Sequence, residues 1–146
     1  MKRDYPDRPI IGVGAVIVNQ GRVLLVRRAT EPLKGEWSVP GGALELGEKL
    51  HDGVRREVLE ETGLTIEPQE VLEVFDSIFN DLDGRTQYHY VLIDYLCTVQ
   101  SGDAHAGSDV SEVRWSTEQE LASLELRESI ERVLRKGLSQ ATRMGG

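Results

Sequence analysis

The chain has 146 residues, of which 39% are hydrophobic and 29% charged, so it is expected to form one domain around one core. Its formal net charge of −8 argues against nucleic acid as a partner, because proteins that bind polyanions need an excess of Lys and Arg.

No apolar signal segment opens the chain, and no apolar run reaches the roughly 20 residues that span a membrane. Cys97 is the only cysteine, which excludes an intrachain disulfide. We therefore expect a cytoplasmic protein without a membrane partner, with Cys97 in its core.

The N-terminal part of the chain predicts an arm followed by a β-hairpin. Residues 1–9 are charged and contain two prolines, which is typical of a loose arm or an edge segment. The apolar runs 10–18 and 22–28 flank Asn-Gln-Gly. Because Asn and Gly tolerate positive φ, we expect these runs to pair as antiparallel strands. Residues 30–42 hold two prolines and three glycines, so they predict a loop that leads into a short strand.

The rest of the chain predicts a helix, a long hairpin and a second helix. Residues 49–62 contain no proline and precede Gly63, which favours a helix of about four turns with a C-terminal glycine cap. Strands are expected at residues 66–79, 85–99 and 113–115, a turn of helix at 117–121, and an amphipathic helix at 126–138. This order favours an α/β fold in which a mixed β-sheet carries helices on both faces. We expect one domain at residues 10–140 and a flexible tail at 141–146.

The first predicted helix carries acidic residues on the face that it should bury. A rotation of about 100° per residue places Glu57 and Glu61 on its apolar stripe and Glu60 beside them. Close carboxylates repel one another in a dry site unless cations lie between them. A hard divalent ion, Mg²⁺ or Mn²⁺ rather than zinc, suits such an all-oxygen set of ligands. A solvated acidic helix face is the alternative explanation of the pattern.

A longer motif contains these residues. Gly42 is followed after five residues by Glu48, and after seven more by Arg56-Glu57-Val58-Leu59-Glu60-Glu61-Thr62-Gly63-Leu64. This motif resembles the Nudix hydrolase signature and matches it at every specified position. The resemblance extends over residues 12–121, with residues 37–42 as the lead-in and residues 112–121 as the downstream segment. It implies an α/β/α sandwich with a mixed β-sheet that hydrolyses nucleoside diphosphates linked to another moiety, using Mg²⁺ or Mn²⁺.

The resemblance also implies roles for individual residues. The metal ligands would be Glu57, Glu60, Glu61 and the carbonyl oxygen of Gly41. Arg56 is expected to orient Glu57 or to pair with Glu48, since a guanidinium fixes carboxylate geometry. The general base is either Glu57 or Glu112. Glu112 follows residues 101–111, which look mobile, so it could swing into the site as base or extra ligand; otherwise it is an exposed loop acid.

Substrate contacts fall outside the motif. Arg28 and Lys34 are candidates for holding substrate phosphates, with solvated side chains as the alternative. Trp37 could stack on a base, although a tryptophan at a loop end also serves as a packing anchor. The resemblance favours ADP-ribose or a nucleotide sugar as substrate. A nucleoside triphosphate is the second candidate, because residues 78–81 lack a proline that ADP-ribose pyrophosphatases often carry there.

A protein with this motif need not be an enzyme, since a Nudix fold can also serve as a binding or regulatory module. The intact set of motif glutamates argues against that interpretation here. The expected partner is a small nucleotide-like phosphoanhydride. A homodimer is also considered, because dimers are common among proteins that carry this motif.

Overall fold

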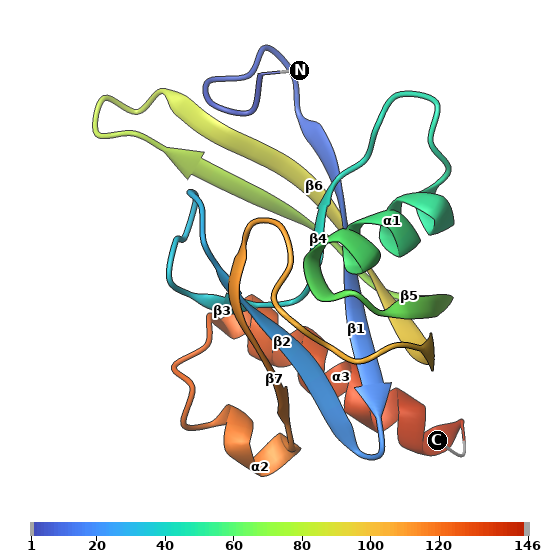
Figure 1. Cartoon of the computed structure of the whole chain (residues 1–146). Coiled ribbons are helices and arrows are strands. Elements are labelled where there is room, and N and C mark those ends of the chain that lie inside the picture. The colour runs from blue at the N-terminus through green and yellow to red at the C-terminus, as the bar shows by residue number, and fades with distance from the viewer. Residues whose placement is uncertain (1, 145–146) are drawn as a thin grey trace.

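A mixed β-sheet forms the centre of the computed structural model, which describes residues 2–144 (Figure 1). β1 (Ile10–Asn19) pairs in parallel with β6 (Thr86–Ser101) and antiparallel with β4 (Gly41–Ala43). β5 (Thr65–Asn80) continues the sheet beyond β6 as its antiparallel neighbour. The long hairpin that the sequence predicts is therefore confirmed, and its two strands extend slightly beyond the predicted bounds.

A second group of strands forms around β2 (Arg22–Arg28). β2 pairs antiparallel with β1 across the turn that joins them. It also pairs antiparallel with β3 (Trp37–Ser38) and with β7 (Val110–Ser116). The predicted first hairpin is thus confirmed. Its turn takes positive φ at Gln20 (52°) and Gly21 (75°), whereas the preceding asparagine lies within β1. When both central residues of a hairpin turn take positive φ, the twist of the turn matches that of the strands it joins.

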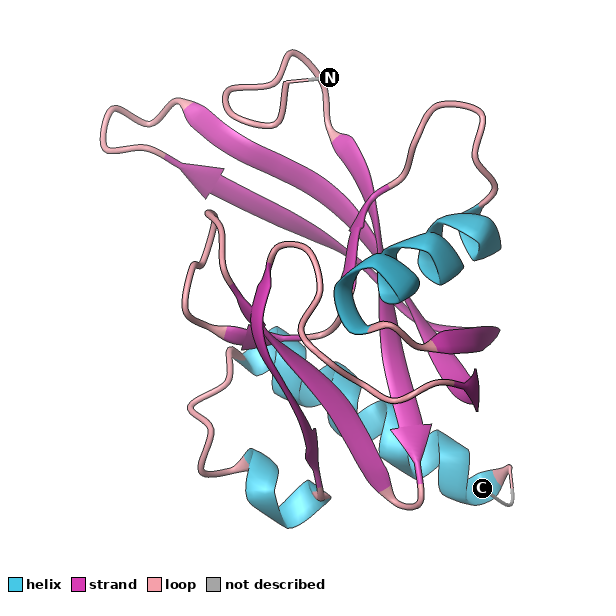
Figure 2. Ribbon diagram, viewed as in Figure 1, coloured by secondary structure: helices cyan, strands magenta, loops and turns pink. Residues whose placement is uncertain are grey.

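Helices cover both faces of the sheet, so the predicted α/β/α sandwich is confirmed (Figure 2). α1 (Leu50–Thr62) packs on one face and α3 (Glu128–Arg143) on the other, with the short α2 (Glu118–Leu121) before α3. Alternate residues of β1 divide between the two cores: Val13 belongs to the cluster beneath α1, and Val16 to the cluster beneath α3. Because strand side chains alternate between faces, β1 serves both cores at once.

The N-terminal arm lies against the tip of the β5–β6 hairpin. The Tyr5 hydroxyl donates to Asp81 Oδ2 over 2.7 Å, and the Tyr5 backbone N–H donates to the Gln87 carbonyl over 2.8 Å. The Arg85 guanidinium lies 4.2 Å from the centre of the Tyr5 ring. These contacts anchor the arm, which the sequence predicted to be either loose or an edge segment.

The C-terminal helix is longer than predicted. α3 continues to Arg143, so residues 141–143 of the expected tail are helical, while residues 145–146 lie outside the described part of the chain. Ala141 explains the extension, because its side chain packs into the core with Val16. Across residues 2–144, no helix combines the length and apolar character needed to cross a membrane.

Candidate active site

The loop between β6 and β7 holds the C-terminal end of α1. Gly63 takes positive φ (77°) and its N–H donates to the Leu59 carbonyl, as expected of a C-terminal glycine cap. Three loop N–H groups donate to the last carbonyls of the helix at distances of 2.7–3.0 Å; they belong to His105, Gly107 and Ser108. The stretch 101–111, predicted to be mobile, is therefore tied to α1 by main-chain hydrogen bonds.

Two glycines form the surface against which the α1 carboxylates lie. A Cβ atom at Gly42 would lie 2.5 Å from the carboxyl carbon of Glu57, so a larger residue there would displace the carboxylate. The Gly41 N–H donates to Glu61 Oε1 over 2.9 Å. Glu57 and Glu61 are consequently buried, at 9% and 8% exposure. The structure thus brings Gly41 and both glutamates together. Gly41 contacts Glu61 through its backbone N–H.

Arg56 ties the loop before α1 to the same carboxylates. Its guanidinium donates to both carboxylate oxygens of Glu48, at 2.7 and 3.0 Å, and to Glu57 Oε1 at 2.9 Å. A further bond reaches the Ala43 carbonyl at 3.1 Å. The sequence predicted that Arg56 either orients Glu57 or pairs with Glu48, and the structure shows both contacts. The hydrogen bonds between Arg56 and Glu48 lower the pKa of Glu48 and raise that of Arg56, so both groups stay charged.

The two inner carboxyl groups are shifted toward their protonated forms. Burial, reinforced by the charge of Glu57 and opposed by the Gly41 N–H, raises the pKa of Glu61 to about 8. Burial also raises the pKa of Glu57, and Arg56 opposes that rise. Beside this pair lies Glu60, whose side chain is 49% exposed and meets Arg56 at 3.4 Å. The inner pair therefore lacks enough positive charge to keep both groups ionised easily.

The chemistry of these side chains fits a hard divalent cation. Within residues 2–144, no three His, Cys, Asp or Glu side chains converge closely enough to form a metal site. In the structure Arg56 donates to Glu57 and Glu60, and the Gly41 N–H donates to Glu61. Neighbouring, partly buried carboxylate oxygens with incomplete charge compensation are nevertheless the ligands that Mg²⁺ prefers. The residues present fit the ion that the resemblance implies.

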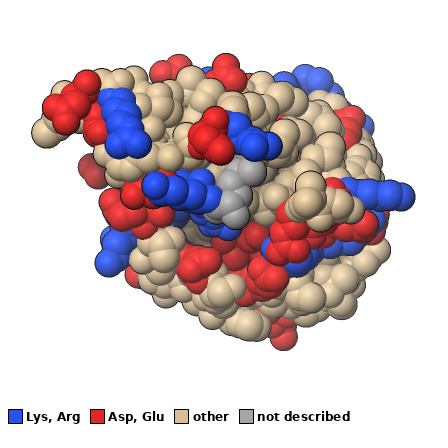
Figure 3. Space-filling model, turned by 90° about the horizontal axis from the view of Figure 1, so that it is seen from above, with Lys and Arg blue, Asp and Glu red and all other residues tan. Residues whose placement is uncertain are grey.

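The carboxylates line one part of a cleft of about 860 Å³. Seen from above, acidic side chains gather near the middle of this face of the molecule, with Lys and Arg side chains beside them (Figure 3). Another part of the cleft wall comes from β5 and β6 and carries aromatic and apolar side chains: Phe75, Phe79, Tyr90 and Leu92. The cleft thus combines a charged region with an apolar one, at a volume that suits a ligand of nucleotide size.

Two of the three predicted substrate contacts line this cleft. Arg28 donates from Nε to the Pro32 carbonyl at 2.6 Å, and its charge lowers the pKa of Glu61 against the effect of burial. Arg28 therefore lies near the carboxylates. Trp37 lines the cleft and also packs against the core beneath α3, as a packing anchor does. Lys34 is exposed and does not line the cleft.

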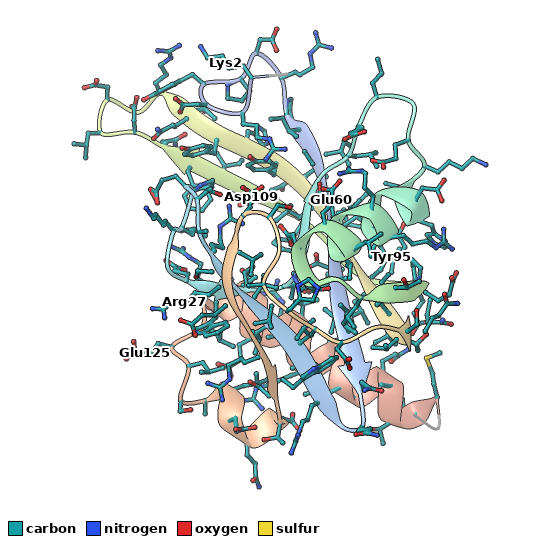
Figure 4. All side chains as sticks on the ribbon, in the orientation of Figure 1. Lys2, Arg27, Glu60, Tyr95, Asp109 and Glu125 are labelled. Carbon is teal, nitrogen blue, oxygen red and sulfur yellow. The ribbon has the colours of Figure 1, made fainter. Side chains whose placement is uncertain are left out.

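Glu112 is exposed, which is one of the two alternatives that the sequence left open for it. This residue lies in β7 opposite Arg27, with a 3.1 Å ion pair between them, and does not line the cleft. Figure 4 shows Arg27 pointing away from α1. The acid that the loop brings to the cleft is Asp109, just before β7, whose charge raises the pKa of Glu61. In Figure 4 its loop lies beside the end of α1 that carries Glu60, in line with the hydrogen bond from the Ser108 N–H to the Glu60 carbonyl.

Several charged residues of the cleft wall were not expected from the sequence, among them Arg3, Asp94 and Arg127. Arg3 comes from the N-terminal arm, and its charge lowers the pKa of Glu57 against the effect of burial. Arg127 donates to Glu36 at 2.8 Å and lies 5.7 Å from the centre of the Phe79 ring. Asp94 had a local signal, because it interrupts the otherwise uncharged strand run 91–97.

An α/β/α sandwich whose cleft carries buried glutamates from one helix defines the structural class of the chain. The family model of the NUDIX domain matches residues 8–137. A MutT NUDIX hydrolase from Burkholderia pseudomallei has a similar structure, with a TM-score of 0.73 and 30% identity, covering 89% of this chain and 98% of that one. The chain belongs to the NUDIX domain family.

Proteins that are similar to this chain in sequence are named for different activities. An ADP-ribose pyrophosphatase from Methanocaldococcus jannaschii is 34% identical over 73% of this chain and 61% of its own length, so the match spans less than two thirds of that relative. A MutT-like protein from Streptomyces ambofaciens is 35% identical over 80% of this chain and 69% of its own length. The nucleoside triphosphatase NudI from an Enterobacter species is 29% identical over 78% of this chain and 86% of its own length.

Proposed function

We propose that the chain is a hydrolase that cuts the diphosphate linkage of a nucleoside diphosphate attached to another moiety, with Mg²⁺ or Mn²⁺ as cofactor. ADP-ribose or a nucleotide sugar is the favoured substrate. The observation that carries this proposal is the pair of buried glutamates, Glu57 and Glu61, held against the Gly41-Gly42 surface in the cleft. Similarity to an ADP-ribose pyrophosphatase supports the substrate class, and the apolar part of the cleft offers a place for the base.

The side chains around the carboxylates have distinct proposed roles. Glu57, Glu60 and Glu61 would hold the cation, which when bound supplies the positive charge that shields the diphosphate and acidifies water. Arg28 lines the cleft near Glu61, where a guanidinium can contact phosphate oxygens. Arg3, from the N-terminal arm, lines the same cleft and adds a second positive charge near Glu57.

Glu57 is the proposed proton acceptor in the hydrolysis. A water oxygen attacks one phosphorus atom, the bond from that phosphorus to the bridging oxygen breaks, and the bridging oxygen leaves with the second phosphate. Glu57 takes the proton from the water, and its 2.9 Å bond from Arg56 fixes the orientation of the carboxylate. We assign the role of a loop acid that assists proton transfer to Asp109 and not to Glu112, because Asp109 lines the cleft.

A substrate panel with product identification tests the proposal. The panel contains ADP-ribose, nucleotide sugars, dinucleoside polyphosphates, and canonical or oxidised nucleoside triphosphates. We expect hydrolysis of at least one nucleoside diphosphate derivative with Mg²⁺ and none in EDTA, with two phosphate monoesters as products by phosphorus NMR. Failure to hydrolyse any of these derivatives would contradict the favoured assignment.

Two other outcomes of the same panel identify the alternatives. Release of pyrophosphate from nucleoside triphosphates alone would favour a triphosphate pyrophosphohydrolase, which similarity to the nucleoside triphosphatase NudI supports. Nucleotide binding without turnover would identify a binding module. A solved structure of the same fold, the NUDIX domain of Shewanella oneidensis NrtR, was determined in complex with ADP ribose; it is 23% identical, with a TM-score of 0.72, and covers 93% of this chain and 90% of that one.

A further inference from the structure

Asp94 is a buried carboxylate that the proposed hydrolysis does not use. It lies in β6 and lines the cleft, although it is only 3% exposed. Within residues 2–144, its Oδ2 atom has no hydrogen-bond partner. A buried polar atom without a partner is costly to the folded state. The Asp94 carboxyl group therefore has acceptor capacity that the described residues leave unused.

The neighbouring strand makes room for this side chain. Gly14 in β1 is the register partner of Asp94, and a Cβ atom at Gly14 would collide with Asp94 Oδ1. On its other side Gly14 pairs with Gly41, whose N–H binds Glu61. Adjacent strands are about 4.8 Å apart, so the backbones at Asp94 and Gly41 lie roughly 10 Å apart across β1. A nucleotide can bridge such a distance, with a phosphate near Glu61 and its base near Asp94.

The charged neighbour of Asp94 is a second carboxylate, not a cation. Glu73 in β5 is the register partner of Asp94, and its Oε1 accepts from Arg132 Nε at 2.9 Å. Its Oε2 also lacks a partner in the described part of the chain. Burial, followed by the charge of Glu73, raises the pKa of Asp94 to about 7. Glu73 does not line the cleft, so Asp94 is the member of the pair that can meet a ligand.

A surface suited to a flat ring adjoins Asp94. The same face of the β5–β6 hairpin continues with the register pairs Phe75–Leu92 and Ser77–Tyr90, and all four residues line the cleft. Aromatic and apolar side chains stack on nucleobases with little preference among them. Hydrogen bonds to the edge of the base supply the discrimination. Asp94 is placed to make such a bond.

We propose that Asp94 accepts a hydrogen bond from the exocyclic amino group of the substrate's base, which makes the cleft selective for bases that carry one. The inference rests on the proposed function, because it assumes a nucleotide in the cleft. A carboxylate oxygen accepts from the amino groups of adenine, guanine or cytosine. A base without that group leaves the buried oxygen unpaired, and binding is weaker for that reason.

Binding of matched nucleotide pairs tests this inference. GDP and IDP differ only in the amino group of the purine, as do ADP and the diphosphate of purine riboside. Isothermal titration calorimetry in Mg²⁺, at a pH above the Asp94 pKa of about 7 so that the carboxyl group is ionised, gives the ratio of dissociation constants within each pair. We expect the wild-type protein to prefer the amino-bearing member of at least one pair by roughly 10- to 100-fold, the range for a hydrogen bond to a charged group. The pair that shows the preference identifies the base.

Variants at two positions assign the preference to Asp94. Asp94→Val should abolish it, and Asp94→Asn should weaken it, because the amide keeps one acceptor oxygen and loses the charge. Glu70→Gln is the matched control, since it removes an exposed carboxylate of β5 that does not line the cleft, and it should retain the preference. Circular dichroism establishes that each variant is folded.

Several outcomes would overturn the inference. These are an undiminished preference in a folded Asp94 variant, no preference in the wild-type protein, or no binding of any of the four nucleotides. The substrate panel is independent of this test. An Asp94-dependent preference without turnover would contradict only the proposed hydrolysis, and turnover without such a preference would contradict only the role of Asp94.

Discussion

Arg56 donates to Glu57 Oε1 over 2.9 Å, although the two residues are neighbours in α1. Successive positions of a helix point about 100° apart, so their side chains do not normally face each other. The contact forms because the Arg56 side chain also reaches Glu48, in the loop before the helix, through two hydrogen bonds. One guanidinium thus fixes the orientation of Glu57 relative to the glycine surface of β4.

Replacing Arg56 with Lys should lower kcat/KM by roughly 10- to 100-fold, the usual cost of losing a residue that orients a ligand. Lysine keeps the charge but lacks the planar fork that holds Glu48 and Glu57 together. Arg55→Lys is the matched control, because Arg55 pairs with Glu67 at 2.6 Å and does not line the cleft. Steady-state kinetics on the active substrate measure both. An equal loss in the two variants would indicate a general effect on the helix.

Arg28 and Lys34 should differ in their effect on KM. The sequence proposed both as phosphate contacts, but only Arg28 lines the cleft. Arg28→Gln should raise KM roughly tenfold, the scale of a lost charge-assisted hydrogen bond. Lys34→Gln should leave KM near its wild-type value, because that side chain is solvated. Unchanged substrate saturation in Arg28→Gln would rule out the phosphate contact.

Asp109 and Glu112 form a second matched pair. Asp109 faces the cleft, whereas Glu112 is held by Arg27 on the outside of β7. Asp109→Asn should lower kcat by about tenfold or more, since an acid that assists proton transfer is lost. Glu112→Gln should keep kcat near the wild-type value. The reverse result would restore Glu112 to the site and refute the placement given by the structure.

Asp94 should affect the pH dependence of stability. Its pKa is raised from 3.8 to about 7 by burial and by the charge of Glu73, so between these values the folded state holds a proton that the unfolded chain has released. The free energy of unfolding should therefore fall as the pH rises through this range, by at most about 1.4 kcal/mol per pH unit from this group. Urea unfolding in EDTA should show a flatter dependence for Asp94→Asn. Parallel curves for the two proteins would contradict the assignment.

The acidic helix was predictable because its signals are local. Helical spacing alone places Glu57 and Glu61 one turn apart on the buried face, and Gly63 ends the helix as its position predicts. The partners of Arg56 could be narrowed to two carboxylates because both lie within the motif. These features depend on residues close in sequence, where periodicity and capping rules apply.

The rest of the cleft could not be predicted because it depends on contacts between distant segments. Asp94 reaches the cleft through the parallel pairing of β1 with β6, and Arg3 reaches it through the docking of Tyr5 on the β5–β6 hairpin. The choice between Asp109 and Glu112 depends on the register of β7 against β2, which contains an irregularity after Arg27. Strand register of this kind is set by packing across the sheet, so the charge that interrupts the run 91–97 marks Asp94 as unusual without showing which strands flank it.

Glu57 and Glu61 are central to the proposed hydrolysis, and the turnover of Glu57→Gln and Glu61→Gln in saturating Mg²⁺ tests their role most directly. Each substitution keeps the size of the side chain and removes one charge next to the glycine surface. We predict that kcat falls by about 100-fold or more in each variant, as expected for the loss of a metal ligand or a base. Wild-type turnover in either folded variant would contradict the proposed mechanism.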